Sequence, residues 1–329
     1  MRWVFASLIG LLGVATAQVG EPPAQLVTAL SALNPTQTEP GAYEADGIAF
    51  TLEAQNELLY SLTGTAVLNP QGQGALAQLV GVATGYGDGI AEPLAEFLGS
   101  RVAELVGQGK IALAVEEFVL TLGVTGDAAP YRASFGLELS EIPEASFPET
   151  AHALGPSDAE IVVREFSDFQ CPYCAQYASK VLPELKEALL ARGDVRFEYH
   201  HLPLSSIHAN AQLAAEAAEC AVAANTPADF WAYHDALFAR QQAWADLGDA
   251  GPYFARLARE IGLENDGVAA CLSEGRYTEV VQEAFRVATQ LGLSSTPSVF
   301  VGSYRVPAGA AQSLAGYEKA IRRLEAFAD

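Results

Sequence analysis

The sequence is poor in lysine, and the resulting charge excludes several classes of partner. Four lysines and fourteen arginines face 40 acidic residues, which gives a formal net charge of −22 over 329 residues. Nucleic acids and anionic membrane surfaces are themselves negative, so neither is an expected partner. Half of the residues are hydrophobic, a composition typical of a globular protein rather than a disordered one.

The sequence is also poor in cysteine, which bears on metal binding. Of four cysteines, two lie in the Cys-x-x-Cys motif at 171–174, whereas Cys220 and Cys271 stand alone. A structural zinc site usually takes four ligands from two such pairs. The adjacent histidines at 200–201 suit a strand end better than chelation. We therefore expect no metal site.

A long membrane-spanning run is lacking as well. The apolar stretch 3–14 follows Met1-Arg2 and precedes Ala15-Thr16-Ala17, an order typical of a secretory signal peptide. It is too short to span a bilayer comfortably, so we expect cleavage near Ala17 and no stable membrane insertion. The mature chain would then be extracytoplasmic, in the periplasm or cell envelope, where disulfides persist.

The Cys-x-x-Cys motif lies between a predicted strand and a predicted helix. Residues 161–166 are rich in branched and aromatic side chains, and residues 175–192 carry apolar side chains at helical spacing. The unpaired N–H groups at a helix N-terminus would stabilise a Cys171 thiolate. Cys174 would resolve a mixed disulfide formed by Cys171. The pattern predicts a redox dithiol.

The chain divides at residues 141–158, a proline-punctuated acidic stretch that we interpret as a linker. Upstream, residues 18–140 form a predicted α+β module without cysteine or histidine, and its role is not indicated by any motif. The expected order is ββααββ, with strands at 48–53, 58–68, 111–124 and 131–139 and helices at 74–85 and 90–106.

Residues 159–329 carry a second pattern. After the redox helix come a strand at 195–204, a helical stretch at about 207–291, a strand at 299–301 with a hairpin partner at 304–307, and a final helix at 313–328.

Several motifs in this half resemble one known family. They are Glu165-Phe166-Ser167-Asp168-Phe169-Gln170-Cys171-Pro172-Tyr173-Cys174, Pro183, His208-Ala209-Asn210-Ala211 and Thr296-Pro297. Together they resemble the DsbA-like branch of the thioredoxin fold, the secreted thiol–disulfide oxidoreductases. The resemblance implies an α/β thioredoxin-like fold with an α-helical insert, here preceded by a separate smaller α+β domain.

The resemblance also implies roles for individual residues. Cys171 would be the attacking thiolate and Cys174 the buried resolving thiol. Pro297 would be a cis proline facing the dithiol, with the backbone of Thr296 turned towards a substrate strand. The dipeptide between the cysteines, Pro172-Tyr173, would tune thiolate stability.

Glu165 and His201 are further candidates. Glu165 interrupts an apolar strand, where a buried carboxylate would relay the proton of Cys174, or would instead pair with Arg164 or Arg196. His201 should emerge at the same sheet edge as the dithiol, where it would tune the redox site or serve as an ordinary loop residue.

The two isolated cysteines both lie in the helical insert. In an oxidising compartment we expect Cys220 and Cys271 to form a structural disulfide, the alternative being two buried free thiols.

These observations favour a secreted thiol–disulfide oxidoreductase that introduces disulfides into unfolded or reduced extracytoplasmic proteins. The resemblance implies re-oxidation by a membrane quinone-linked partner, and no cofactor is expected. The nearest alternative is a disulfide isomerase or reductase that uses residues 18–140 to dimerise or to bind clients. A non-catalytic scaffold with a thioredoxin fold is the alternative of another class.

Overall fold

The computed structural model describes residues 3–4, 18–149, 152–222, 227–263 and 267–328. They form two compact units, one of residues 1–141 with 322–329 and the other of residues 142–321. The predicted signal peptide lies outside the described residues, apart from the two-residue strand β1 (Trp3–Val4). Among the described residues, no helix combines the length and apolar character needed to cross a bilayer.

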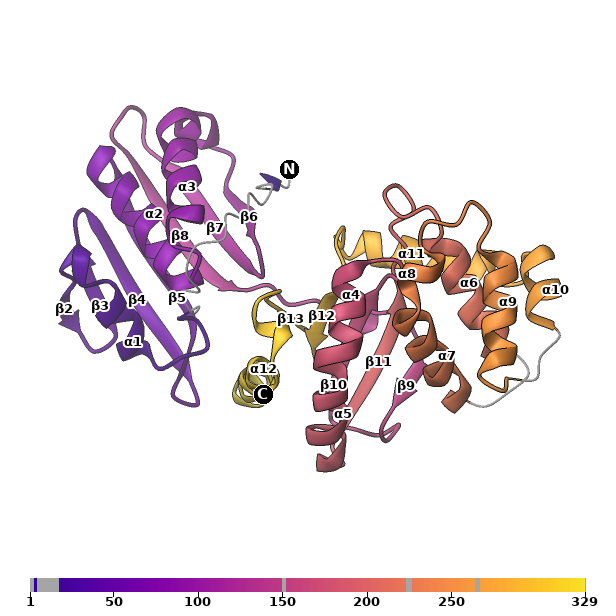
Figure 1. The fold of residues 1–329 in the computed structure, drawn as a ribbon. Coiled ribbons are helices and arrows are strands. Elements are labelled where there is room, and N and C mark those ends of the chain that lie inside the picture. The colour runs from indigo at the N-terminus through magenta and orange to yellow at the C-terminus, as the bar shows by residue number, and fades with distance from the viewer. Residues whose placement is uncertain (1–2, 5–17, 150–151, 223–226, 264–266, 329) are drawn as a thin grey trace. The chain divides into compact units, whose positions relative to one another are not determined.

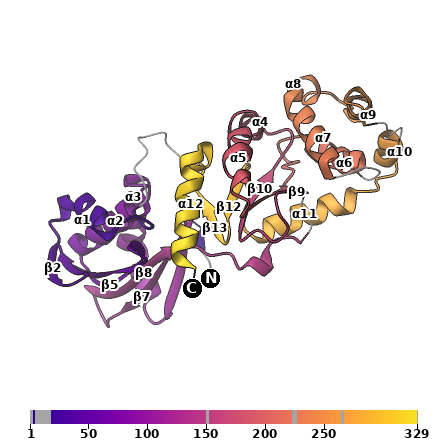
Figure 2. The same ribbon diagram turned by 90° about the horizontal axis from the view of Figure 1, so that it is seen from below.

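The first unit is a sheet with helices on one face (Figures 1 and 2). The sheet runs in the order β1-β6-β7-β8-β5-β4-β3-β2, antiparallel except where β1 meets β6. Its elements after β1 are α1 (Pro23–Ala29), β2 (Thr36–Glu39), β3 (Ala42–Ala45), β4 (Ile48–Gln55), β5 (Leu58–Leu68), α2 (Pro70–Thr84), α3 (Asp88–Arg101), β6 (Lys110–Val115), β7 (Phe118–Thr125) and β8 (Tyr131–Leu139).

Alternation along the strands decides which face the helices cover. In β8, Ala133, Phe135 and Leu137 are buried, whereas Arg132, Ser134 and Glu138, which alternate with them, are exposed. Side chains of a strand point alternately to opposite faces. One face is therefore apolar and packs against the helices, and the other carries polar and charged side chains.

Two strand predictions for this unit need correction. The stretch 111–124 is not one strand but two, β6 and β7, because the chain turns at Glu116, which has a φ of 52°. The strands β2 and β3 were not predicted. All four residues of β2 are exposed, so no apolar alternation marks it.

The second unit contains a sheet of order β13-β12-β10-β11-β9. The central strand β10 is parallel to β11 and antiparallel to β12. The strands and helices of this unit are β9 (His152–Leu154), β10 (Ile161–Ser167), α4 (Pro172–Gln176), α5 (Leu182–Ala188), β11 (Val195–His201), α6 (Ala211–Val222), α7 (Pro227–Ala239), α8 (Gln241–Trp244), α9 (Gly251–Glu260), α10 (Gly267–Ser273), α11 (Thr278–Gln290), β12 (Ser298–Val301), β13 (Tyr304–Val306) and the first part of α12 (Leu314–Phe327), whose residues from Arg322 onward belong to the first unit.

The stretch 141–158, expected to be a linker, contributes to the second unit. Phe147 is 7% exposed and packs in a cluster with Phe166 and Phe300. Strand β9 adds an antiparallel edge to β11. The prolines that made the stretch look like a linker flank a short 3₁₀ turn, Glu144–Ser146.

The helix after the dithiol is less regular than the sequence indicates. A π-helical turn, Tyr177–Val181, separates α4 from α5, and Pro183 lies in the first turn of α5. The hydroxyl groups of Tyr177 and Tyr317 lie 2.6 Å apart, which joins this turn to α12.

Candidate redox site

The Cys-x-x-Cys motif lies where the chain leaves β10 and enters α4. Cys171 is the N-cap residue of α4 and Pro172 is the first helical residue, a position where proline lacks only an N–H that would be unpaired anyway. Cys171 is 4% exposed and Cys174 is completely buried, whereas Tyr173 between them is 70% exposed. Both cysteines are free thiols in this structure.

The two thiols have opposite electrostatic environments. The Cys174 thiol, as a hydrogen-bond donor, is the main cause that lowers the pKa of Cys171 to about 6, with help from Thr296 and the backbone N–H groups of Tyr173 and Cys174, against the effect of burial. Burial, together with the adjacent Cys171 thiolate, raises the pKa of Cys174 well above its ordinary value. The pair therefore favours a thiolate on Cys171 and a neutral thiol on Cys174.

The loop before β12 faces this pair. The Sγ atom of Cys171 lies 3.5 Å from the carbonyl oxygen of Thr296. The Thr296–Pro297 peptide bond is cis, as the resemblance implied.

Glu165 is fully buried at the centre of β10, opposite Tyr199 on one side and Val299 on the other. Neither carboxylate oxygen has a hydrogen-bond partner among the described residues. Burial raises the pKa of Glu165 to about 8, partly offset by Ser167 and Lys186. A carboxyl group in this position is neutral at pH 7 and charged only in alkali.

The arginines considered as partners of Glu165 are engaged elsewhere. Arg164 pairs with Glu144 at 2.6 Å and with Glu198 at 3.3 Å, and Arg196 pairs with Glu198 at 2.8 Å. The alternative that an arginine neutralises Glu165 is therefore wrong.

Two polar side chains that were not predicted to belong to the site fasten the redox loop to the insert. The amide of Gln241 in α8 donates to the backbone carbonyls of Phe169 (2.8 Å) and Cys171 (2.9 Å). Gln170 donates to the carbonyl of Ala245, and its own side-chain oxygen accepts from the backbone N–H of Asn210. Because Gln241 lies 70 residues from Cys171 in the sequence, no local motif identifies it.

The carboxylate of Asp168 also holds the redox loop in place through hydrogen bonds. It accepts hydrogen bonds from the backbone N–H groups of Gln170 (2.7 Å) and Leu204 (2.9 Å), and His208 lies 2.7 Å away. The buried carboxylate thus joins the loop after β10 to the loop after β11.

His201 has a partner other than the dithiol. Its Nε2 atom lies 2.8 Å from the Oε1 atom of Glu219 in α6, and the same oxygen lies 2.7 Å from Nε2 of His152 in β9. None of the hydrogen bonds and ion pairs found among the described residues joins His201 to Cys171. Residue 152 lies in the stretch predicted to be a linker, and no sequence motif joins it to His201 and Glu219.

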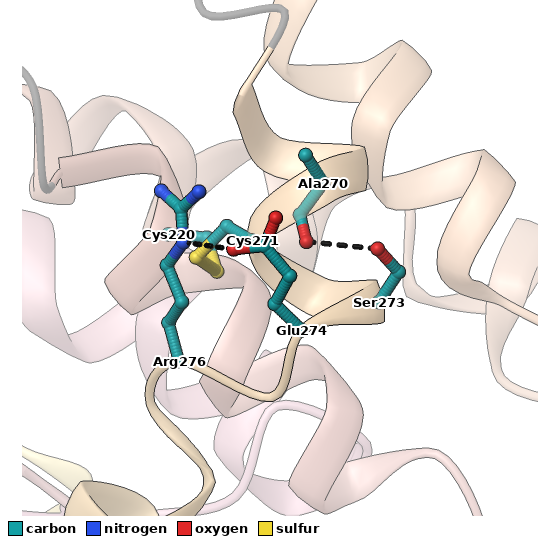
Figure 3. Close-up of a disulfide and its surroundings, with 6 residues drawn as sticks. All are labelled: Cys220, Ala270, Cys271, Ser273, Glu274 and Arg276. Atoms are coloured by element: carbon teal, nitrogen blue, oxygen red, sulfur yellow. Dashed lines mark hydrogen bonds and ion pairs between the residues drawn. A yellow bond between two sulfur atoms is a disulfide. The ribbon is translucent and has the colours of Figure 1, made fainter.

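The remaining cysteines are bonded to each other. Cys220 in α6 and Cys271 in α10 form a disulfide with a Cα–Cα distance of 5.9 Å (Figure 3). This is the pairing expected from the sequence. Beside it, the hydroxyl of Ser273 donates to the carbonyl of Ala270, and Arg276 pairs with Glu274 (Figure 3).

Comparison with known proteins assigns the second unit to a family. The family model described as Thioredoxin matches residues 148–323, more than half of the chain. The chain therefore belongs to the thioredoxin family, and within it to the DsbA-like branch of thiol–disulfide oxidoreductases. Its fold is thioredoxin-like, with a helical insert and a separate N-terminal sheet unit.

Individual relatives match the same half of the chain. The "Probable disulfide bond formation protein D" of Bacillus anthracis is 34% identical, over 46% of this chain and 70% of that protein. The "Na(+)/H(+) antiporter NhaA 3" of Salinispora tropica is 33% identical over a region that makes up 54% of this chain. The same region makes up only 26% of that protein, so the chain spans about a quarter of its length. The solved structure of BdbD from Bacillus subtilis shares 22% identity and has a TM-score of 0.48, covering 56% of this chain and 97% of that one.

Proposed function

We propose that the protein is an extracytoplasmic thiol–disulfide oxidoreductase that introduces disulfides into client proteins through Cys171 and Cys174. The observation that carries the proposal is the stabilised Cys171 thiolate, with its pKa lowered to about 6 by the Cys174 thiol and the α4 N-terminus. A stable thiolate favours the reduced enzyme, and a dithiol whose reduced form is stabilised is a strong oxidant.

The reaction begins with the Cys171–Cys174 disulfide. A client thiolate attacks Sγ of Cys171, the bond between the enzyme's sulfurs breaks, and Cys174 leaves as a thiolate. A second client thiolate then attacks the client sulfur of the mixed disulfide and expels Cys171 as a thiolate. Two electrons pass from client to enzyme, and the client gains a disulfide.

Glu165 has the proton that the first step requires. Its pKa of about 8 keeps the carboxyl group protonated at neutral pH, and Cys174 as a leaving thiolate is a strong base, with a pKa well above its ordinary value. Proton transfer from Glu165 to Cys174 would prevent the reverse attack. Solvent protons would reload Glu165 between turnovers.

The Thr296 carbonyl would receive the client. It lies 3.5 Å from Sγ of Cys171, so an extended client segment that donates a backbone N–H to this loop would bring its own sulfur to the dithiol. Pro172, exposed Tyr173 and Pro297 would form the surface around that segment. The clients would be unfolded or reduced extracytoplasmic proteins, and re-oxidation would require a membrane quinone-linked partner.

The direct test is the reduction potential of the Cys171–Cys174 pair, measured by equilibrating the mature protein with glutathione and determining its thiol state. A potential close to about −120 mV supports a disulfide donor, and one close to about −270 mV indicates a reductase instead. Cys171→Ser should abolish turnover, and Cys174→Ser should accumulate mixed disulfides. A scaffold protein would keep its function in both variants.

A disulfide isomerase is the second candidate, supported by a surface hollow in the first unit. The hollow has a volume of about 930 Å³ and lies on the sheet face opposite the helices, with Thr65, Thr125 and Ser134 in its lining. Such a surface could hold a client during reshuffling. An isomerase should rescue scrambled disulfides faster than it oxidises reduced ones, and equilibrium sedimentation would show whether the chain dimerises.

A further inference from the structure

Three side chains with metal-binding chemistry meet away from the dithiol. They come from three elements, with His152 in the edge strand β9, His201 at the end of β11 and Glu219 in α6. The Nε2 atoms of both histidines lie within 2.8 Å of one carboxylate oxygen, Oε1 of Glu219. The three ligand atoms all lie within 4.8 Å of one another.

These distances are close to those of a coordination sphere. A tetrahedral Zn²⁺ ion binds imidazole nitrogen and carboxylate oxygen at about 2.0–2.2 Å, which places neighbouring ligand atoms about 3.3 Å apart. The two N–O separations, 2.7 Å and 2.8 Å, would need to widen by roughly half an ångström. The two Nε2 atoms, which lie at most 4.8 Å apart, would have to reach the same spacing, so binding requires all three side chains to adjust.

The surroundings suit a site with one open position. The His201 side chain is 5% exposed, whereas those of Glu219 and His152 are 14% and 19% exposed. The ring of Phe230 stacks on the imidazole of His152 with 3.5 Å between the ring centroids, and the rings of Phe169 and Tyr199 pack against His201. The cluster is therefore closed by aromatic rings on the His201 side and reaches solvent on the other, where a water molecule would complete four-coordination.

The scaffold also holds the ligands in place. His201 is fixed in the central sheet opposite Ser167. Glu219 precedes Cys220, whose disulfide to Cys271 ties α6 to α10. Because these side chains are already held in position, less conformational entropy is lost when an ion binds to them.

We propose that His152, His201 and Glu219 form a binding site for a divalent transition-metal ion, with Zn²⁺ as the ion that best fits two imidazoles, a carboxylate and a water. The bound ion joins the edge strand β9 and the sheet to the helical insert. It is separate from the dithiol and has no part in the redox reaction. The competing description is a metal-free pin, in which both histidines only share hydrogen bonds with Glu219.

The test is a calorimetric titration of Zn²⁺ into the oxidised mature protein, in which the Cys171–Cys174 disulfide removes the competing thiolate ligands. One ion per chain should bind. Glu219→Gln should weaken binding at least about 100-fold, because even the loss of an outer-shell partner costs 10–100-fold. Glu216→Gln is the matched control, since Glu216 is a buried glutamate one turn earlier in α6, and it should bind as the wild type does.

A second variant and a spectroscopic readout cover the case in which Glu219→Gln fails to fold. His152→Asn alters a partly exposed residue of an edge strand and should weaken binding similarly. Co²⁺ in the oxidised wild type should give visible absorption of a four-coordinate site without thiolate charge-transfer bands, and His152→Asn should lose it. Absence of saturable binding in the wild type, or equal affinity in the wild type and both ligand variants, would overturn the site and leave the metal-free pin.

Discussion

The lowered pKa of Cys171 predicts a change of slope in the pH dependence of the reduction potential. Below pH 6 the reduced enzyme carries both thiol protons, so each pH unit should shift the potential by about 60 mV for two protons and two electrons. Above pH 6 Cys171 is a thiolate and Cys174 remains protonated. Only one proton is then taken up, and the slope should fall to about 30 mV per pH unit.

The size of the effect follows from the two pKa values. Lowering the pKa of Cys171 from 9.0 to about 6 corresponds to about 4 kcal/mol at most, at about 1.36 kcal/mol per pH unit. Because the pKa of Cys171 is lower in the folded protein than in the unfolded one, this stabilisation of the reduced folded enzyme is complete above pH 9 and is lost as the pH falls through 6. At pH 7 it amounts to about 1.4 kcal/mol, or about 30 mV in favour of the reduced enzyme.

The assay is equilibration with a redox buffer of known potential between about pH 4 and pH 9, with the thiol state read by alkylation. Ultraviolet absorbance of the thiolate gives the Cys171 pKa independently. Cys174→Ala should raise that pKa, because the Cys174 thiol is the largest cause of its lowering. A single slope of about 60 mV per pH unit up to pH 8, or an unchanged pKa in Cys174→Ala, would refute the reasoning.

Three further predictions concern residues around the dithiol. Glu165→Gln should slow turnover at pH 7 by roughly 100-fold or more, the usual contribution of a positioned acid, and turnover equal to that of the wild type would contradict proton transfer from Glu165 to Cys174. The variant should also lack the loss of folding stability that the wild type shows as the pH rises from 4.5 to about 8. Cys271→Ser opens a disulfide between residues 51 apart and should lower the unfolding free energy by about 4 kcal/mol on the chain-entropy model, as measured by urea denaturation, while the potential of the dithiol stays the same. Gln241→Ala should destabilise the second unit by about 1–3 kcal/mol, because two backbone carbonyls lose their donor. The control is Gln242→Ala at the neighbouring exposed residue, and equal effects of the two substitutions would show that the hydrogen bonds of Gln241 do not stabilise the loop.

The strands and helices that position the dithiol were predictable because they follow simple periodic patterns. The branched residues of 161–167 and the alternation in 131–139 indicate strands with little competition from other structures. The predicted linker failed for a physical reason. Prolines near Phe147 suggested irregular chain, but whether such a segment is solvated or packed depends on the apolar cluster it meets, which is formed by residues far away in the sequence.

The site was predictable to the extent that its residues are close in the sequence. Cys171, Cys174 and Glu165 lie within ten residues and share one strand–helix unit. The absence of an ion-pair partner for Glu165 was not predictable in this way. Arg164 is its direct neighbour in the sequence, yet the Arg164 side chain pairs with Glu144 and Glu198. Adjacent strand residues face opposite sides of a sheet, so proximity in the sequence favoured the wrong ion pair.

The polar contacts of the redox loop indicate how the insert contributes to the chemistry. Gln241 holds the carbonyl of Cys171 itself, while Asn210 donates from its side chain to the carbonyls of Ala245 and Leu247 and from its backbone to Gln170. The loop is therefore fixed on the insert side as well as on the sheet side, where Asp168 binds it. A thiolate is stabilised by helix N–H groups only while they point at the sulfur. Loosening the insert should consequently raise the pKa of Cys171 even when no residue of the Cys-x-x-Cys motif is changed, and the same thiolate titration applied to Asn210→Ala tests this, because an unaltered pKa would mean that α4 orients the sulfur without the insert.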